Sequence, residues 1–245
     1  CFHQNLDHGF LMLADFGDRL LLHQLRQDYT HTPYYAALEV LLQLQTIHDP
    51  RLPCFNHAHI LQELSLFSEW FLQRYLQLSL TPAERQLLQD TQLYLAQALT
   101  QQPQVFIHRD YHSRNLMPLS DQRLGVIDFQ DAMIGPIGYD IVSLLKDCYI
   151  QWPLEDCLAY WQYYHQRAPQ VSHLPFDTFS RYVEDCGLQR HLKVLGIFSR
   201  LALRDGKPHY LNDLPLTLHY VMQVLACRPE LHTFYHFMQQ RVSLP

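Results

Sequence analysis

The chain has 245 residues, of which 48% are hydrophobic and only 17% are charged. This composition supplies enough apolar surface for a large buried core and excludes an intrinsically disordered chain. The formal net charge of −6, with no run of Lys or Arg, gives no electrostatic footprint for nucleic acid or for an anionic membrane surface. We therefore expect neither nucleic acid nor a membrane as a partner.

The cysteine pattern argues against a disulfide framework and against a zinc site. Six cysteines are scattered along the chain, and no two of them form a C-x-x-C pair. No apolar run is long enough to span a bilayer, and the N-terminus lacks the basic and apolar regions of a signal peptide. We therefore expect a soluble protein of the reducing cytoplasm.

Helices dominate the first hundred residues. Residues 9–14 form a short apolar run suited to a strand, and a turn over 15–18 leads into an apolar helix from about Arg19. Three further helices are predicted from their capping residues, which are Thr32 followed by Pro33, then Asn56, and then Thr81 with Glu84.

The middle of the chain is predicted to form a small β-hairpin. Two runs rich in β-branched or aromatic residues, at 104–108 and 124–129, flank a polar loop. Beyond Tyr139 the apolar spacing is helical again, with a possible break near Gly187. The helices predicted there span 139–149, 155–167, 176–205, 213–226 and 230–241.

The stretch Asp15-Phe16-Gly17 matches the tripeptide that presents a metal-binding aspartate in protein kinases. It precedes the catalytic-loop pattern "HRDYHSRN" at 108–115, whereas in protein kinases it follows that pattern. No lysine and no glycine-rich phosphate loop precede this pattern, and the chain begins at Cys1 rather than Met. We therefore expect a fragment that lacks an upstream nucleotide-binding part.

The polar loop offers the groups that phosphoryl transfer needs. A carboxylate must orient and deprotonate the attacking hydroxyl, and oxygen ligands must hold magnesium on the phosphates. Asp110 is the candidate catalytic base, and Asn115 and Asp128 are the candidate Mg²⁺ ligands. His108 and Arg109 are expected to position the loop.

Two other interpretations use the same residues. Asp110 and Asn115 can be turn formers, with Asp128 a residue that only ends a strand. Alternatively, His108, Asp110 and His112 can be ligands of a hydrolytic metal site, because alternate residues can face one way. The second interpretation leaves Asn115 and Asp128 unexplained.

The pattern H-x-D-x-H-x-x-N, followed by I-D-x-x-D, resembles that of the aminoglycoside phosphotransferase and choline kinase family. The resemblance implies a protein-kinase-like α+β fold, with a mainly α-helical C-terminal lobe, a small catalytic β-hairpin and most of the N-terminal lobe missing. It places the end of that lobe and the hinge at 1–18 and the C-terminal lobe at 19–245. ATP and Mg²⁺ are the implied cofactors, and the activity of this stretch without the missing lobe is left open.

The same resemblance assigns roles to single residues. Adenine would stack against the hinge, and "DFQ" at 128–130 would be the counterpart of the kinase tripeptide, so that Asp15-Phe16-Gly17 is a coincidence. Asp140 would brace the catalytic loop rather than react. The hinge residues implied to bind the nucleotide are Met12, Leu13, Ala14 and Asp15.

The tract at 187–211 narrows the resemblance to bacterial N-acetylmuramate/N-acetylglucosamine anomeric kinases of cell-wall recycling. That likeness implies ATP-dependent phosphorylation of the anomeric hydroxyl of a small amino sugar. Arg190, Lys193, Arg200 and Arg204 recur at near-helical spacing, which suits either a solvated helix face or a contact with the lactyl carboxylate of N-acetylmuramate. The candidate sugar-binding residues are His112, Gln130, Asp131, Arg200 and Arg204.

Two rival functions remain at this point. The first is another small-molecule kinase of the same fold, acting on an aminoglycoside, an amino alcohol such as choline, or a different sugar. The second is a pseudokinase-like binding module, which only the missing nucleotide-binding residues favour.

Overall fold

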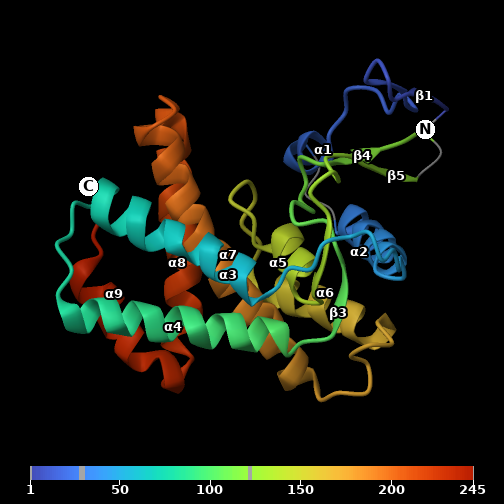
Figure 1. The fold of residues 1–245 in the computed structure, drawn as a ribbon. Coiled ribbons are helices and arrows are strands. Elements are labelled where there is room, and N and C mark those ends of the chain that lie inside the picture. Colours follow the sequence, from blue (N-terminus) through green and yellow to red (C-terminus); the bar gives the residue numbers. More distant parts are fainter. Residues whose placement is uncertain (1, 28–30, 121–122, 245) are drawn as a thin grey trace.

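The computed structural model describes residues 2–27, 31–120 and 123–244 of the chain (Figure 1). Its α-helices are α1 (Leu21–Gln27), α2 (Thr32–Leu44), α3 (His57–Leu66), α4 (Pro82–Thr100), α5 (Tyr139–Leu145), α6 (Leu154–Arg167), α7 (Phe176–Leu203), α8 (Leu214–Ala226) and α9 (His232–Arg241). Its strands are β1 (His3–Asn5), β2 (Phe10–Met12), β3 (Gln104–Ile107), β4 (Leu116–Pro118), β5 (Leu124–Val126) and β6 (Met133–Pro136). A π-helical segment, Phe67–Tyr75, continues α3, and two short 3₁₀ helices span Pro208–Asp213 and Pro229–Leu231.

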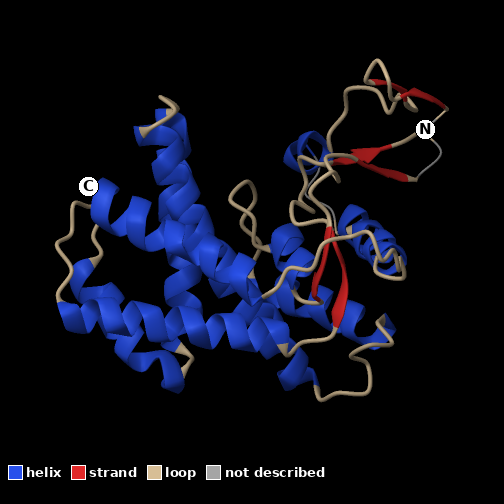
Figure 2. Cartoon of the chain, viewed as in Figure 1, coloured by secondary structure: helices blue, strands red, loops and turns tan. Residues whose placement is uncertain are grey.

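The strands gather on one side of the molecule, and helices fill the other side (Figure 2). The long helix α7 contacts α3, α5, α8 and the π-helical segment, so its sides are buried over most of its length. The predicted break near Gly187 is wrong, because α7 is continuous from Phe176 to Leu203. In the described part of the chain, no helix is both long and apolar enough to cross a membrane.

Helix starts follow the capping chemistry of the sequence. Asn56 caps α3 by accepting a hydrogen bond from the backbone N–H of His59 at 3.1 Å. Thr81 and Glu84 form the predicted capping box at the start of α4, with reciprocal bonds of 3.2 and 2.7 Å. The predicted start of α2 differs from the structure by one residue. Its N-cap is His31 and not Thr32, so Thr32 lies inside the helix.

Strand pairing differs from the predicted hairpin over 104–108 and 124–129. β3 pairs antiparallel with β6, and β4 pairs antiparallel with β5. The hairpin prediction is wrong because the second apolar run pairs with β4 and not with β3. The actual partner of β3, Met133–Pro136, contains Gly and Pro and so gives no clear strand pattern in the sequence.

Close helix packing makes Gly196 a sensitive position. A Cβ atom built on Gly196 would lie 2.4 Å from the carbonyl carbon of Leu66, where α3 passes into the π-helical segment. We therefore expect Gly196→Ala to lower the free energy of unfolding by about 1–3 kcal/mol, because backbone must move apart. Chemical denaturation would measure this loss.

Gly187→Ala is the matched control on the same helix. There the new Cβ would meet a side-chain methyl of Val142 at 3.1 Å, which can shift, and Ala favours the helix by about 1 kcal/mol. Equal unfolding free energies for the two variants would contradict the close-packing argument.

Candidate active site

The catalytic loop begins where β3 ends, and Asp140 of α5 holds its first residues. One carboxylate oxygen of Asp140 accepts the backbone N–H of His108 at 2.6 Å, and the other accepts that of Arg109 at 3.0 Å. Arg109 has a φ of +75°, in the left-handed region that a non-glycine residue rarely adopts. Burial raises the pKa of Asp140 to about 7, although the two N–H donors oppose that shift. This geometry agrees with the expected bracing role of Asp140.

Asp110 lies next on the loop, with 48% of its side chain exposed at the edge of a cavity. A side-chain nitrogen of Arg190 lies 3.4 Å from its Oδ1 atom. Burial opposes ionisation of Asp110, but the charges of Arg190 and then Lys193 outweigh it and hold its pKa below the ordinary range. Asp110 is therefore an ionised carboxylate at neutral pH, as a proton-accepting group requires.

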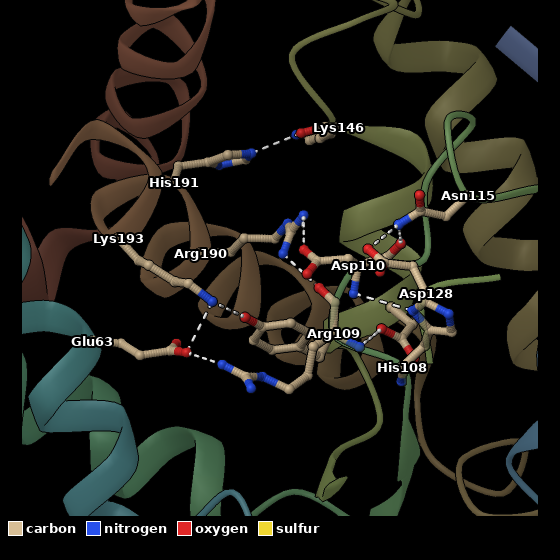
Figure 3. Close-up of polar contacts among 12 residues, drawn as sticks. Glu63, His108, Arg109, Asp110, Asn115, Asp128, Lys146, Arg190, His191 and Lys193 are labelled. Carbon is tan, nitrogen blue, oxygen red and sulfur yellow. Dashed lines mark hydrogen bonds and ion pairs between the residues drawn. The ribbon is translucent and has the colours of Figure 1, made fainter. Parts of the chain in front are cut away.

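Asn115 and Asp128 lie beside the base (Figure 3). The side-chain amide of Asn115 donates to the backbone carbonyl oxygen of Asp110 at 2.9 Å and to the Asp128 carboxylate at 3.4 Å. Gln130 donates to the other oxygen of Asp128 at 2.8 Å. Three residues predicted from the sequence to act together are therefore neighbours in space, although Asp128 follows a different strand.

The donor set suits a hard cation. Carboxylate and amide oxygens are the ligands that Mg²⁺ prefers, usually one or two from the protein with phosphate oxygens and water completing the shell. Within the described residues, no group of three or more His, Cys, Asp or Glu side chains is placed to hold a metal alone. Asn115 and Asp128 therefore fit a magnesium ion that arrives with a nucleotide.

The alternative metal site of His108, Asp110 and His112 conflicts with the hydrogen bonds of His108. Its Nε2 lies 2.9 Å from the carbonyl oxygen of Ile127, and its Nδ1 accepts the backbone N–H of Asp110 at 3.3 Å. Both ring nitrogens of this buried histidine are therefore engaged by the backbone. His108 links the loop to the segment that carries Asp128 instead of binding a metal.

A cavity of about 390 Å³ opens beside Asp110. Its polar lining residues include His112, Asp131, Arg190 and Lys193. Its apolar lining residues include Leu66 of α3 and Val194, Ile197 and Phe198 of α7. The cavity thus offers an apolar surface and several hydrogen-bonding groups within reach of one carboxylate, as small-molecule sites commonly do.

The candidate sugar-binding residues divide into two sets. His112 and Asp131 line the cavity, and Gln130 contacts Asp128. Arg200 and Arg204 do not line it, because they follow Lys193 by two and three turns of α7, or roughly 10 and 16 Å along the helix. Arg204 is exposed and pairs with its neighbour Asp205 at 2.6 Å. The predicted basic stripe is therefore not one continuous surface.

His112 is electrically neutral at physiological pH. Burial, followed by the charge of Arg190, lowers its pKa to about 4. Its ring packs edge-on against Tyr149, with 5.3 Å between ring centroids. His112 can thus donate or accept a hydrogen bond in the cavity but adds no charge to it.

Glu63 is a site residue that sequence reasoning missed. This buried carboxylate of α3 forms ion pairs with Arg109 at 2.5 Å and Lys193 at 2.9 Å, and it accepts a hydrogen bond from Gln189 at 2.9 Å. Burial opposes its ionisation, but Lys193 and Arg109 hold its pKa below the ordinary value. The available signal was a charged residue beside Ile60 and Leu64 on the buried face of an amphipathic helix.

The hinge prediction rests on the N-terminal segment. Asp15 accepts the backbone N–H of Gly17 at 2.8 Å in a tight turn, and the Phe16 ring lies against Gly125 of β5. Met12 and Leu13 are more than half exposed and do not line the cavity beside Asp110. The nucleotide-binding role of Met12, Leu13, Ala14 and Asp15 stays a prediction.

The sequence model of the phosphotransferase enzyme family matches residues 6–174. The chain belongs to this phosphotransferase family. It is 41% identical to an N-acetylmuramate/N-acetylglucosamine kinase of Pseudomonas putida over 93% of this chain and 68% of that protein. It is also 41% identical to a Neisseria meningitidis protein of the same name, over 98% of this chain and 74% of the relative.

Solved kinases share the fold of this phosphotransferase family member. A Plasmodium vivax ethanolamine kinase aligns with a TM-score of 0.60 at 13% identity, covering 90% of this chain and 64% of that one. An aminoglycoside phosphotransferase in its ADP-bound form aligns with a TM-score of 0.52 at 17% identity, covering 83% of this chain and 69% of that one. These alignments confirm the expected helix-rich, protein-kinase-like fold.

Proposed function

We propose that this chain carries the catalytic lobe of an ATP-dependent kinase that phosphorylates the anomeric hydroxyl of N-acetylmuramate and N-acetylglucosamine. The observation that carries the proposal is the convergence of Asn115 and Asp128 on Asp110, which lines a cavity sized for a monosaccharide. The 41% identity to kinases named for these two sugars supports the choice of substrate. The proposed role is cell-wall sugar recycling in the cytoplasm, where ATP is available.

Asp110 performs the proton chemistry in the proposed reaction. It accepts a hydrogen bond from the anomeric hydroxyl and takes its proton as the sugar oxygen bonds to the terminal phosphorus of ATP. The bond from that phosphorus to the bridging oxygen breaks, and ADP leaves. A Mg²⁺ ion held by Asn115 and Asp128 would neutralise charge on the phosphates.

The cavity also suits N-acetylated sugars. Its apolar wall of Val194, Ile197 and Phe198 suits an acetyl methyl group, whereas a free ammonium group there would lose its hydration. His112 and Asp131 are the proposed partners of sugar hydroxyls.

A substrate screen of the full-length protein tests this function. ATP consumption is expected with N-acetylmuramate and N-acetylglucosamine, and little is expected with glucosamine, choline or aminoglycosides. Phosphorus NMR of the product would locate the phosphate on the anomeric oxygen. Turnover of an aminoglycoside but of neither sugar would refute the substrate assignment while leaving the phosphotransferase family intact.

Arg204→Met tests whether the basic stripe reaches the sugar acid. Because Arg204 lies outside the cavity and already pairs with Asp205, we expect unchanged kcat/KM for both sugars. A charge-assisted contact with the lactyl carboxylate would contribute about 1.5–3 kcal/mol, or roughly 10- to 100-fold in kcat/KM. A loss of that size confined to N-acetylmuramate would restore the role predicted from the sequence.

A further inference from the structure

Arg190 of α7 contacts the catalytic loop directly. Its side chain is only 8% exposed. One guanidinium nitrogen donates to the backbone carbonyl oxygen of Arg109 at 2.7 Å, and the other lies 3.4 Å from the carboxylate of Asp110 (Figure 3). The planar guanidinium group therefore spans the backbone just before the catalytic base and the base itself.

These contacts complete the support of a backbone segment in an unfavourable conformation. Arg109 has a left-handed φ, and its N–H is held by Asp140 from the α5 side. Arg190 holds the carbonyl oxygen of the same residue from the α7 side. The peptide group that carries Asp110 is thus fixed between two helices, which sets the direction of the Asp110 side chain.

Arg190 is also the cation in direct contact with Asp110. The charged or titratable groups that face Asp110 are Arg190 and Lys193 of α7, His108, Arg109 and His112 of the loop, and Tyr139 and Asp140 of α5. Of these, Lys193 and Arg109 form ion pairs with Glu63, and His112 is neutral at pH 7. Substitution of Arg190 should therefore change the charge environment of Asp110 more than substitution of any other neighbour.

We propose that Arg190 is a positioning residue that aims the carboxylate of Asp110 at the sugar hydroxyl. This inference rests on the proposed function for the identity of the acceptor, but the contact with Asp110 is independent of the sugar. Arg190 acts through Asp110 and is not itself a proton donor or acceptor in the reaction.

Two substitutions separate geometry from charge in the full-length protein. Arg190→Met removes both the hydrogen bonds and the charge, so kcat is expected to fall about 100-fold, the scale of a misplaced catalytic group. Its acid limb in the pH–kcat profile should move to higher pH. Arg190→Lys keeps the positive charge but lacks the planar guanidinium group that contacts both Arg109 and Asp110. Its kcat should therefore fall about 10-fold while the acid limb stays in place.

Carbon-13 NMR of the Asp110 carboxyl gives a readout that does not require turnover. The midpoint of its titration should rise in Arg190→Met and remain close to wild type in Arg190→Lys; Asp110→Asn identifies the signal. Arg51→Met is the control for loss of an arginine elsewhere, because Arg51 is exposed, pairs with Asp49 and does not line the cavity. It should leave both kcat and the Asp110 titration unchanged.

The outcomes distinguish this inference from the proposed function. An Arg190→Met protein with the titration midpoint and acid limb of wild type would overturn the positioning role. If Arg190→Met does not fold, Arg190→Lys decides, because wild-type kcat in that variant would also overturn it. A wild-type protein inactive on both sugars would refute the proposed substrates, and the NMR comparison would still decide the role of Arg190.

Discussion

Asp110→Asn is expected to lower kcat about 10³-fold for either sugar, the scale on which a positioned general base contributes. Asparagine has nearly the same shape as aspartate, but it cannot take the proton of the sugar hydroxyl. The backbone carbonyl of residue 110 still accepts its bond from Asn115, so the loop keeps its geometry. Steady-state kinetics with coupled detection of ADP would measure the loss.

Thermal unfolding and nucleotide binding are the controls for this variant. Both should stay close to wild type, because the Asp110 side chain is 48% exposed and asparagine in its place can still accept the hydrogen bond of Arg190. Turnover within tenfold of wild type would mean that Asp110 is not the base. A large drop in the unfolding temperature would instead show that the residue is structural.

Asp128→Ala is expected to weaken magnesium-dependent ATP binding more than Asn115→Ala does. The carboxylate of Asp128 is the only charged member of the proposed ligand pair, so its loss should cost about 100-fold in affinity. Asn115→Ala removes a neutral oxygen and should cost about 10-fold, together with a fall in kcat because its amide holds the Asp110 carbonyl. Calorimetric titration of ATP with Mg²⁺ would compare the two.

The same titrations in EDTA provide the control. Without a divalent cation, the affinities of wild type and both variants should agree, since the substitutions act through the metal. Equal losses with and without Mg²⁺ would count against the metal roles of Asn115 and Asp128. Small and equal effects in Mg²⁺ would favour the interpretation of these residues as turn and strand-end formers.

Features that depend on interactions between residues close in the sequence could be predicted from the sequence alone. The capping groups of Asn56 and Thr81 act within three residues of themselves, so the starts of α3 and α4 needed no tertiary information. The residues of the catalytic loop were readable for a related reason. Their spacing reflects one loop and the strand that follows it, and the structure places Asp110, Asn115 and Asp128 together.

Contacts between residues far apart in the sequence could not be predicted in this way. The pairing of β3 with β6 joins segments about 29 residues apart, and the Gly and Pro of β6 conceal its strand character. The ion pair of Glu63 with Lys193 joins residues 130 apart in the sequence, and its ion pair with Arg109 joins residues 46 apart. A regular spacing of cations along α7 likewise could not reveal that Arg190 and Lys193 are buried while Arg204 is exposed.

Arg109 and Asp128 have functional side chains at backbone conformations that favour glycine. Both adopt positive φ values, of +75° and +67°, where a side chain costs roughly 1 kcal/mol and glycine costs almost nothing. Glycine at 128 would relax the backbone but remove the carboxylate. Glycine at 109 would relax it too but remove the guanidinium group that pairs with Glu63. Thermal stability alone would therefore favour glycine at 128, where the side chain is exposed, but not at 109, where the ion pair with Glu63 would be lost. Asp128 thus marks a position where this fold accepts backbone strain in order to carry a carboxylate beside Asp110.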